Sequence, residues 1–417
     1  MKKIYKATIC AVLLVTISII PHSKAQDISV KKGHPRLILS NTDIKQMREN
    51  VLSGTEPWKT SWGNLKHQLD SYVDKGTPKV YRGNISMAFY QAAIKEGSMA
   101  RDLSIAYQIT KDKAYANKAI EIIKSWSSEE GGLAGLSFDS TKYYPNTGML
   151  VSRGVFTFLY AYDLLAADKL IDKKTEKQFK NWLRILVPHI KEGARRWEIN
   201  DYFGKQYYQN HIAADAVGLL SLGVILRDNQ LVKYAYDGQD NPRNIKNVIE
   251  GLILMKDQKP YSGEPGSWPV QDGEIMDRYR HFALHHYQET TKPNRALQYA
   301  GLSTNLLVIA AEIAQLNGLD LYGWKAATGE EIKQPLLFYA DFYIQKDASI
   351  KGGFYDGETY WINTNNQATF SLWEVAHSRY PSEAKFKEVL KNNDRSSGDL
   401  HLLGPVLLTH GRSIDNE

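Results

Sequence analysis

The stretch YYQNHIAADA places two amides and an imidazole directly before an apolar, Ala-rich segment. The side chains of Gln209, Asn210 and His211 can all donate hydrogen bonds toward one point beyond a helix N-terminus. A helix N-terminus stabilises an anion, such as the carboxylate of a uronate sugar. A purely structural interpretation is also open, because Asn210 is a good N-cap residue and His211 would then be a surface histidine in the first turn.

A second stretch, KPNRALQY, combines two cations with a tyrosine at the start of another apolar segment. Arg295 and Tyr299 are four residues apart and share one face of a helix, and Lys292 lies near that face if its turn is helical. A cation beside a tyrosine lowers the pKa of a phenol, which suits a tyrosine that must take and return a proton. The alternative is a tyrosine packed between helices beside a surface arginine.

Hydrolysis of a glycosidic bond would instead need two carboxyl groups that flank the bond. Glu274 and Asp277 are three residues apart and could face a groove together, but Arg278 and Arg280 favour an ion-paired helix start. The candidate carboxylates are Asp163, Asp215, Glu264, Glu274 and Asp277. These residues keep a glycoside hydrolase open as a rival to an enzyme that works by proton transfer.

The sequence offers no good metal site. His285 and His286 are adjacent, so on a helix their side chains would diverge by about 100°. The chain has no HExxH, no CxxC and no acidic calcium loop, and it has no Gly-rich phosphate loop. We therefore expect an enzyme without a metal ion or another cofactor.

The elements that position these residues are predicted to be helices. After Pro35 apolar residues recur at spacings of three and four, for example at Leu302, Leu306 and Ile309, in about a dozen segments. Alternating strand patterns are rare, and the best of them, at 354–362, predicts at most a small β-hairpin. The pattern predicts an all-α fold, an (α/α) toroid or incomplete barrel of about six to seven helix hairpins. An α-solenoid is the alternative, but it would require a repeat consensus.

Four polar breaks between the helices, at 131–146, 200–210, 259–273 and 351–366, are rich in Tyr, Trp and Gly. Long loops in a compact helical domain are usually functional. Aromatic side chains there can stack on sugar rings or pack the loops onto the toroid. They are Tyr143, Tyr144, Tyr207, Tyr208, Trp268, Tyr355 and Trp361. Arg153 follows the first break and could reach a second carboxylate of the substrate or form a structural ion pair.

Residues 1–25 have the features of a secretory signal peptide. A basic MKKIYK precedes the apolar ATICAVLLVTISII, and Ser23 and Ala25 form a cleavage site with predicted cutting after Ala25. This predicts a periplasmic or secreted protein whose residues 26–417 form a single catalytic domain. The only cysteine, Cys10, lies within the signal peptide, so the mature chain has no disulfide or thiol chemistry.

Composition limits the classes of partner. The chain has 417 residues, of which 43% are hydrophobic and 24% charged, as in ordinary globular proteins. Its net charge of +6 falls to +2 when the four lysines and no acids of residues 1–25 are removed. A nearly neutral chain gives no indication of nucleic-acid binding, although a local basic groove can still hold an acidic ligand. We expect an acidic polysaccharide as the partner, no membrane association, and a monomer.

Longer runs around both stretches resemble a known family. The run NRALQYAGLSTNLLVIAAEIAQLNG resembles the alginate lyase helix that carries an Arg-Ala-Leu-x-Tyr core, and QNHIAADAVGLLSLGV resembles the Asn-Asn-His helix of the same lyases. The two occur in the same order with comparable spacing, and NTGMLVSRGVFTFLYAYDLL resembles an inner helix of toroidal uronate lyases. The resemblance is to the alginate lyase superfamily, closer to polysaccharide lyase family 38 than to family 5. It implies β-elimination on a polyuronate, first of all alginate, with glucuronan as the alternative.

The resemblance assigns roles to individual residues. Tyr299 matches the tyrosine that acts as Brønsted base and acid. His211 matches a histidine that serves as a second base or carboxylate neutraliser, and Asn210 matches the neutralising asparagine. Gln209 stands where the family has a second asparagine. Lys292 stands where familiar alginate lyases have an arginine, seven residues before the tyrosine.

That departure leaves the source of the neutralising charge open. Arg295 can take the role, or an arginine can come from the segment DGEIMDRYRHFALHHY, which also contains His281. The pair Arg280 and Tyr287 repeats the spacing of seven and is a rival register, but it lacks the Ala-Leu-x-Tyr context. A protonated Glu274 beside the substrate carboxylate is a further alternative. The predicted substrate-binding residues are Gln209, Lys292, Arg280, Glu274, His281, Tyr208, Tyr144, Arg153 and Trp268.

Two other function classes stay open at this point. One is a toroidal glycoside hydrolase that acts on unsaturated uronides or other glycans through an Asp/Glu pair. The other is a non-catalytic toroid that binds glycans through its aromatic loops.

Overall fold

The computed structural model describes residues 28–76, 80–128, 131–133, 136, 138–142, 145–198, 208–256, 258, 269–278, 295–351, 355, 358, 362 and 369–414. In this part of the chain nearly all regular structure is helical, and one sheet has two strands of two residues each. The all-α prediction is confirmed. The predicted signal peptide lies outside the described residues.

The helices follow one another with short connections. They are α1 (Asn41–Leu52), α2 (Trp58–Val73), α3 (Met87–Thr110), α4 (Lys113–Trp126), α5 (Thr147–Ala167), α6 (Lys173–Glu198), α7 (Asn210–Leu226), α8 (Asn229–Tyr236), α9 (Ile245–Leu252), α11 (Ala296–Leu316), α12 (Lys333–Gln345), α14 (Leu372–Arg379), α15 (Ala384–Lys391) and α16 (Val406–His410). Short 3-10 turns are η1 (Ser140–Lys142), η3 (Ser349–Lys351), η5 (Thr369–Ser371) and η6 (Arg395–Ser397).

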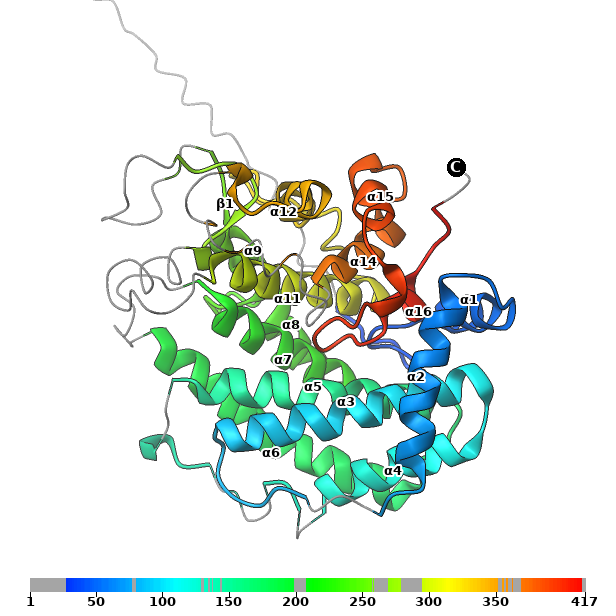
Figure 1. Cartoon of the computed structure of the whole chain (residues 1–417). Helices are drawn as coiled ribbons and strands as arrows, with labels where there is room; N and C mark the ends of the chain where they lie inside the picture. The colour runs from blue at the N-terminus through cyan, green and yellow to red at the C-terminus, as the bar shows by residue number, and fades with distance from the viewer. Residues whose placement is uncertain are drawn as a thin grey trace, which may run out of the picture.

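The helices form a toroid with an inner and an outer layer (Figure 1). Helices α3, α5, α7 and α11 pack side by side in that order, and each also packs against the outer helix that follows it: α4, α6, α8 and α12. Helix α12 contacts α15, α15 contacts α14, and α14 contacts α16, which packs against α1. The first and last helices of the fold therefore lie together, as the predicted toroid requires.

Burial explains which helices are inner. All residues of α7 except the last are buried, and α5 is buried on almost every face, so both need neighbours on all sides. Helices α5 and α11 are long and apolar enough to cross a membrane by length and composition. In this fold, however, 89% and 78% of their most apolar windows lie buried inside the toroid.

The small sheet forms at a different place from the predicted hairpin. Strand β1 (Ile253–Leu254) pairs antiparallel with β2 (Glu274–Ile275). In the segment 354–362 the described residues Tyr355, Glu358 and Ile362 are not in strands. Tyr355 is fully buried against Tyr339, and the other aromatic residues of this segment lie outside the described residues.

A buried ion pair ties α11 to α14 near the point where the toroid closes. The guanidinium of Arg379 donates two hydrogen bonds to the carboxylate of Glu312, which is 0% exposed. Burial alone would raise the pKa of Glu312, but the hydrogen bonds and charge of Arg379 and the nearby His410 outweigh it and hold this pKa at about 2. The carboxylate is therefore ionised in the folded protein at every ordinary pH.

Replacing Glu312 with Gln is expected to lower the free energy of unfolding by about 3–5 kcal/mol, because Arg379 loses its countercharge. The folded pKa lies below the ordinary value of 4.5. The stabilisation is thus complete above about pH 4.5 and is lost as the pH falls toward 2. Denaturant unfolding as a function of pH measures both effects. The exposed pair Lys45–Glu49 offers a control, since Glu49→Gln should cost less than about 1 kcal/mol; equal losses in the two variants would contradict this account.

Candidate active site

The N-terminal turns of the inner helices meet at one end of the toroid. Tyr90 is the fourth residue of α3, Arg153 the seventh of α5, and Tyr299 the fourth of α11, and all three line the same pocket. His211 is the second residue of α7, the inner helix between α5 and α11. The positive ends of several helix dipoles therefore point toward one region, which favours an anionic ligand there.

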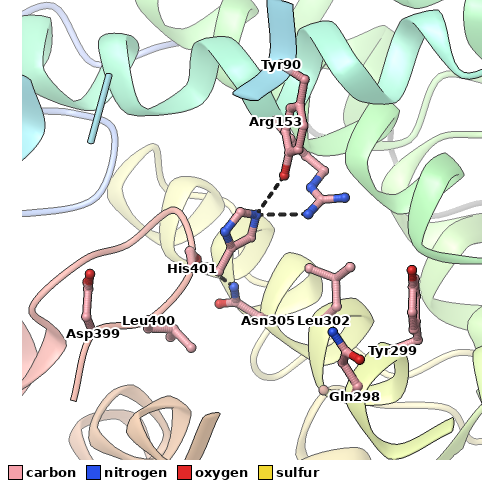
Figure 2. Close-up of a pocket in the computed structure, with 10 residues that line it drawn as sticks. Tyr90, Arg153, Gln298, Tyr299, Leu302, Asn305, Asp399, Leu400 and His401 are labelled. Carbon is pink, nitrogen blue, oxygen red and sulfur yellow. Dashed lines mark hydrogen bonds between the residues drawn. The ribbon is translucent and has the colours of Figure 1, made fainter. Parts of the chain in front are cut away.

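The pocket has a volume of about 290 Å³. It is lined by Tyr90, Arg153, Gln298, Tyr299, Gly301, Leu302, Asn305, Asp399, Leu400 and His401. Gln298, Leu302 and Asn305 lie on one face of α11, since successive helix residues are 100° apart. Figure 2 shows Tyr299 rising from α11 with its hydroxyl directed toward the side from which Tyr90 and Arg153 enter.

Arg153 supplies a half-buried positive charge to this pocket. Its Nη2 lies 3.0 Å from Nε2 of His401, its Nη1 lies 3.5 Å from the sulfur of Met149, and its guanidinium stacks 5.1 Å from the ring centre of Tyr90. Burial lowers the pKa of Arg153, yet a guanidinium keeps its proton in proteins. None of its contacts with described residues is to a carboxylate, so the charge is available to an anion that enters the pocket.

Tyr299 lines the pocket, and its helix α11 packs against α7. It is half-buried. Ser303, one turn further along α11, donates to Oδ2 of Asp277, and Asp277 accepts from the backbone N–H and the side-chain amide of Asn210, at 2.8 and 3.0 Å. Asp277 thus links the first residue of α7 to the helix that carries Tyr299. The two predicted stretches, about 90 residues apart in the sequence, are brought together in this way.

Asn210 does not act as the N-cap that the sequence suggested. The N-cap is Gln209, one residue earlier, and its side chain makes no capping hydrogen bond. The side-chain N–H group of Asn210 donates to the carboxylate of Asp277 in a charge-assisted hydrogen bond, which holds the side chain away from a capping position. This contact also fixes the orientation of the amide, and Oδ1 of Asn210 has no partner among the described residues.

The other residues of the first stretch are packed around the start of α7. His211 is 7% exposed, and its ring lies on that of Trp197 with centroids 4.4 Å apart. Tyr208 donates a hydrogen bond to the carbonyl of Pro242 at 3.3 Å. Its ring also fills the space beside Gly251, where any side chain would collide with it. Neither His211 nor Tyr208 lines the pocket described above.

Arg295 lies at the start of α11 as the residue before its first turn, and it is exposed. The first turn is held instead by Glu358, a residue that no sequence pattern pointed to. The carboxyl of Glu358 accepts from the backbone N–H groups of Leu297 and Gln298, at 2.8 and 3.1 Å. Burial raises the pKa of Glu358 to about 7 against the opposing effect of these donors. The cation of the pocket is Arg153, and Arg295 does not line it.

Three of the carboxylates that a hydrolase could use are engaged elsewhere, and a fourth, Asp215, is 2% exposed with its pKa raised by burial and does not line the pocket. Glu274 is 1% exposed and forms an ion pair with Arg278, so it offers almost no surface to a substrate. Asp163 accepts from the backbone N–H groups of Arg36 and Leu37, at 2.8 and 2.7 Å. Asp277 binds Asn210 as described above. Among the described carboxyl groups, only Asp399 lines the pocket.

Several predicted residues cannot be placed. Tyr144, Glu264, Trp268, Arg280, His281, Tyr287 and Lys292 lie outside the described residues. In the described part of the chain, no group of three or more His, Cys, Asp or Glu side chains is arranged to hold a metal ion.

Sequence reasoning missed His401, Tyr90 and Asn305. His401 comes from a turn between η6 and α16, more than 80 residues after the last predicted stretch. Its one sequence signal is the break Gly398–Pro405, which is polar at its start and contains two glycines and a proline. The described site combines the phenol of Tyr299, the half-buried guanidinium of Arg153 and the neutral imidazole of His401. Such a set can bind an anion and move a proton beside it.

Comparison with known proteins gives one family. The family model described as alginate lyase matches residues 42–248, about half of the chain. The matched region includes Asn210 and His211 and ends before α11. No curated protein is similar enough to the chain to count as a match.

Solved structures of alginate lyases are similar to this chain over 91% of its length. Alginate lyase A1-III from Sphingomonas species A1 is 15% identical with a TM-score of 0.55, over 91% of this chain and 100% of that chain. Its tyrosine-to-phenylalanine variant complexed with a tetrasaccharide is 16% identical with a TM-score of 0.56, over 91% and 99%. An alginate lyase from Bacteroides ovatus is 12% identical with a TM-score of 0.60, over 91% and 100%. At these identities the likeness establishes the fold.

Proposed function

Because this chain is a polysaccharide lyase of the alginate lyase superfamily, we propose that it cleaves a polyuronate, first of all alginate, by β-elimination. One observation carries the proposal. Tyr299 and a half-buried Arg153, which has no carboxylate partner among the described residues, share a pocket at the N-terminal ends of the inner helices. Export through residues 1–25 to the periplasm or the medium is part of the proposal, since alginate is too large to be met inside the cell.

The chemical difficulty of the reaction explains these residue types. The C5 proton of a uronate is hard to remove because the ionised carboxylate beside it barely stabilises the carbanion. A guanidinium that binds the carboxylate, together with helix N-termini, stabilises the charge that develops there. In the proposed site Arg153 binds the carboxylate, and the amide of Asn210 and the imidazole of His211 support it from the start of α7.

Tyr299 performs the proton transfers in this proposal. Its deprotonated oxygen takes the C5 proton. The electron pair forms the C4=C5 double bond while the bond from C4 to the glycosidic oxygen breaks. The phenol then returns its proton to that oxygen. No water and no nucleophile enter the products, so no second carboxyl group is required.

Incubation of the protein with alginate is expected to raise the ultraviolet absorbance of the C4=C5 double bond. Glucuronan and unsaturated uronate oligomers complete the panel. A rise in absorbance with glucuronan alone would identify glucuronan, and not alginate, as the substrate. A fall in absorbance with the unsaturated oligomers would indicate a hydrolase of unsaturated uronides, and binding without any change would indicate a glycan-binding toroid. Loss of polymer without a rise in absorbance would contradict the proposal.

A toroidal glycoside hydrolase is less well supported. Such an enzyme needs two carboxyl groups on opposite sides of the bond. Asp399 is the one described carboxylate that lines the pocket, and Glu274, Asp163 and Asp277 are held by the contacts given above.

A further inference from the structure

The turn that carries His401 is built to hold its backbone in one place. Leu400 and Gly404 exchange two backbone hydrogen bonds, at 2.8 and 2.7 Å. Leu402 has a φ of 72° and Gly404 a φ of 80°, so the chain reverses through left-handed conformations. A side chain at Gly404 would lie 2.4 Å from Nε of Arg101, which leaves room only for glycine.

Two inner helices fix this turn from either side. Arg101 of α3, itself paired with Asp102, donates from Nη1 to the carbonyl of Leu402 at 3.0 Å. Asn305 of α11 donates from its amide to the carbonyl of His401 at 2.8 Å. The position of the imidazole is therefore set by the same helices that contribute Tyr90 and Tyr299 to the pocket.

The contact with Arg153 determines the chemical form of His401. A guanidinium can only donate hydrogen bonds, so Nε2 of His401, at 3.0 Å from Nη2, must be an unprotonated acceptor. The ring proton of the neutral imidazole is then on Nδ1. Figure 2 shows the Tyr90 hydroxyl directed to the same Nε2 atom, at 3.5 Å. Burial, followed by the charges of Arg153 and Arg101, lowers the pKa of His401 well below its ordinary value of 6.5.

A neutral acceptor suits a guanidinium that has to bind a substrate. A carboxylate in the place of His401 would orient Arg153 equally well, but it would cancel the charge that attracts the uronate. A neutral imidazole orients the guanidinium and leaves its full charge available. The other contacts of Arg153, a thioether and an aromatic face, are too weak to fix its direction alone.

We propose that His401 is a positioning residue, which holds the Arg153 guanidinium in the direction that receives the substrate carboxylate. The inference rests on the proposed function, in which Arg153 binds that carboxylate. The charged or titratable groups that face His401 are Tyr90 and Arg101 of α3, Arg153 of α5, Tyr299 of α11 and Asp399 of its own turn. Protonation of His401 would break its bond to Arg153, so substrate binding weakens only in acid well below pH 6.5, because the pKa of this imidazole is lowered.

The first test reads the imidazole directly and does not depend on catalysis. Nitrogen-15 NMR of histidine-labelled protein is expected to show His401 with its proton on Nδ1 at neutral pH, and to show that it stays neutral below pH 6.5. In Arg153→Met the imidazole is no longer held, so this tautomer and the resistance to protonation are both reduced. A proton on Nε2 in the unmutated protein, or an identical spectrum in Arg153→Met, would overturn the proposal.

The second test uses kinetics with a conservative rescue. His401→Ala is expected to raise KM by about tenfold or more, the usual cost of a lost hydrogen bond to a charged group, with a smaller change in kcat. His401→Gln keeps an acceptor, so its KM should stay within about threefold of the unmutated value, and its KM should no longer rise in acid. The exposed His67 supplies a control in His67→Ala, which should change neither constant.

The outcomes separate this inference from the proposed function. Equal defects in His401→Gln and His401→Ala, or unchanged KM in both, would overturn the positioning role. If the unmutated protein cleaves no polyuronate at any pH, the proposed function fails, and the NMR result still decides whether His401 holds Arg153.

Discussion

Replacement of Tyr299 with Phe is expected to lower kcat on alginate by roughly a hundredfold to ten-thousandfold, the range for loss of a general acid–base group. The change removes one oxygen atom and keeps the ring, so packing against α11 and the pocket volume should be preserved. Binding of an alginate oligosaccharide should therefore stay within severalfold of the unmutated protein. Initial rates of absorbance increase give kcat, and calorimetry with the inactive variant gives the binding constant.

Tyr90→Phe is the matched control, because Tyr90 lines the same pocket and its hydroxyl also approaches His401. It should lose less than about tenfold in kcat, since only one weak hydrogen bond is removed. The opposite pattern, with Tyr90→Phe inactive and Tyr299→Phe active, would show that Tyr90 is the catalytic base. If Tyr287→Phe abolishes activity while Tyr299→Phe does not, the rival register of Arg280 and Tyr287 is the correct one.

Replacement of Arg153 with Met is expected to lower kcat/KM by roughly a hundredfold to a thousandfold, the cost of losing a desolvated charge partner. The free energy of unfolding should be unchanged or higher, because the variant no longer half-buries a guanidinium that has no carboxylate partner among the described residues. A residue that served only the fold would show the reverse, with lower stability and little loss of kcat/KM. Kinetics and denaturant unfolding of the same preparation distinguish the two.

Arg153→Lys tests the geometry of this contact. Lysine retains the charge but presents a compact ammonium, which cannot form the paired hydrogen bonds of a guanidinium. We expect an intermediate kcat/KM with a steeper dependence on salt than in the unmutated protein. Full activity in Arg153→Met would show that Arg153 does not bind the substrate carboxylate. That role would then belong to Arg295 or to a cation outside the described residues.

Much of the architecture could be predicted because it depends on local patterns. Apolar spacing of three and four identified the inner helices, and the two motif helices could be recognised from short runs of residues. The location of the small sheet could not, because β1 and β2 contain two residues each and pair across a 19-residue connection. The predicted hairpin at 354–362 lies mostly outside the described residues, and of its aromatic residues only Tyr355, which is buried, is described.

The site was only partly predictable because its groups come from distant segments. Tyr299 could be singled out by its motif, and Arg153 by its position after a polar loop. His401 enters the pocket only through the turn that Arg101 and Asn305 hold in place. Such contacts span 96 to 301 residues of sequence and leave no local pattern. Glu358 was missed for the same reason, as it holds the start of α11 from 61 residues away.

The start of α7 was predicted in the right segment, but the predicted N-cap role of Asn210 was wrong. Asparagine before an apolar helix is a standard N-cap signal. Here Asp277 lies close enough to take both the backbone N–H and the amide of Asn210, so the helix begins one residue earlier in the motif than capping rules suggest. No rule of local sequence could include a carboxylate 67 residues away.

The most direct test of the central claim is to digest alginate with the protein in ¹⁸O-labelled water and determine the masses of the oligosaccharides. β-Elimination forms the new end by loss of a proton and cleavage at C4, so no water oxygen enters any product. The account predicts unsaturated oligosaccharides without label, and none of them from Tyr299→Phe. Saturated oligosaccharides that carry one labelled oxygen each would show hydrolysis and contradict the account.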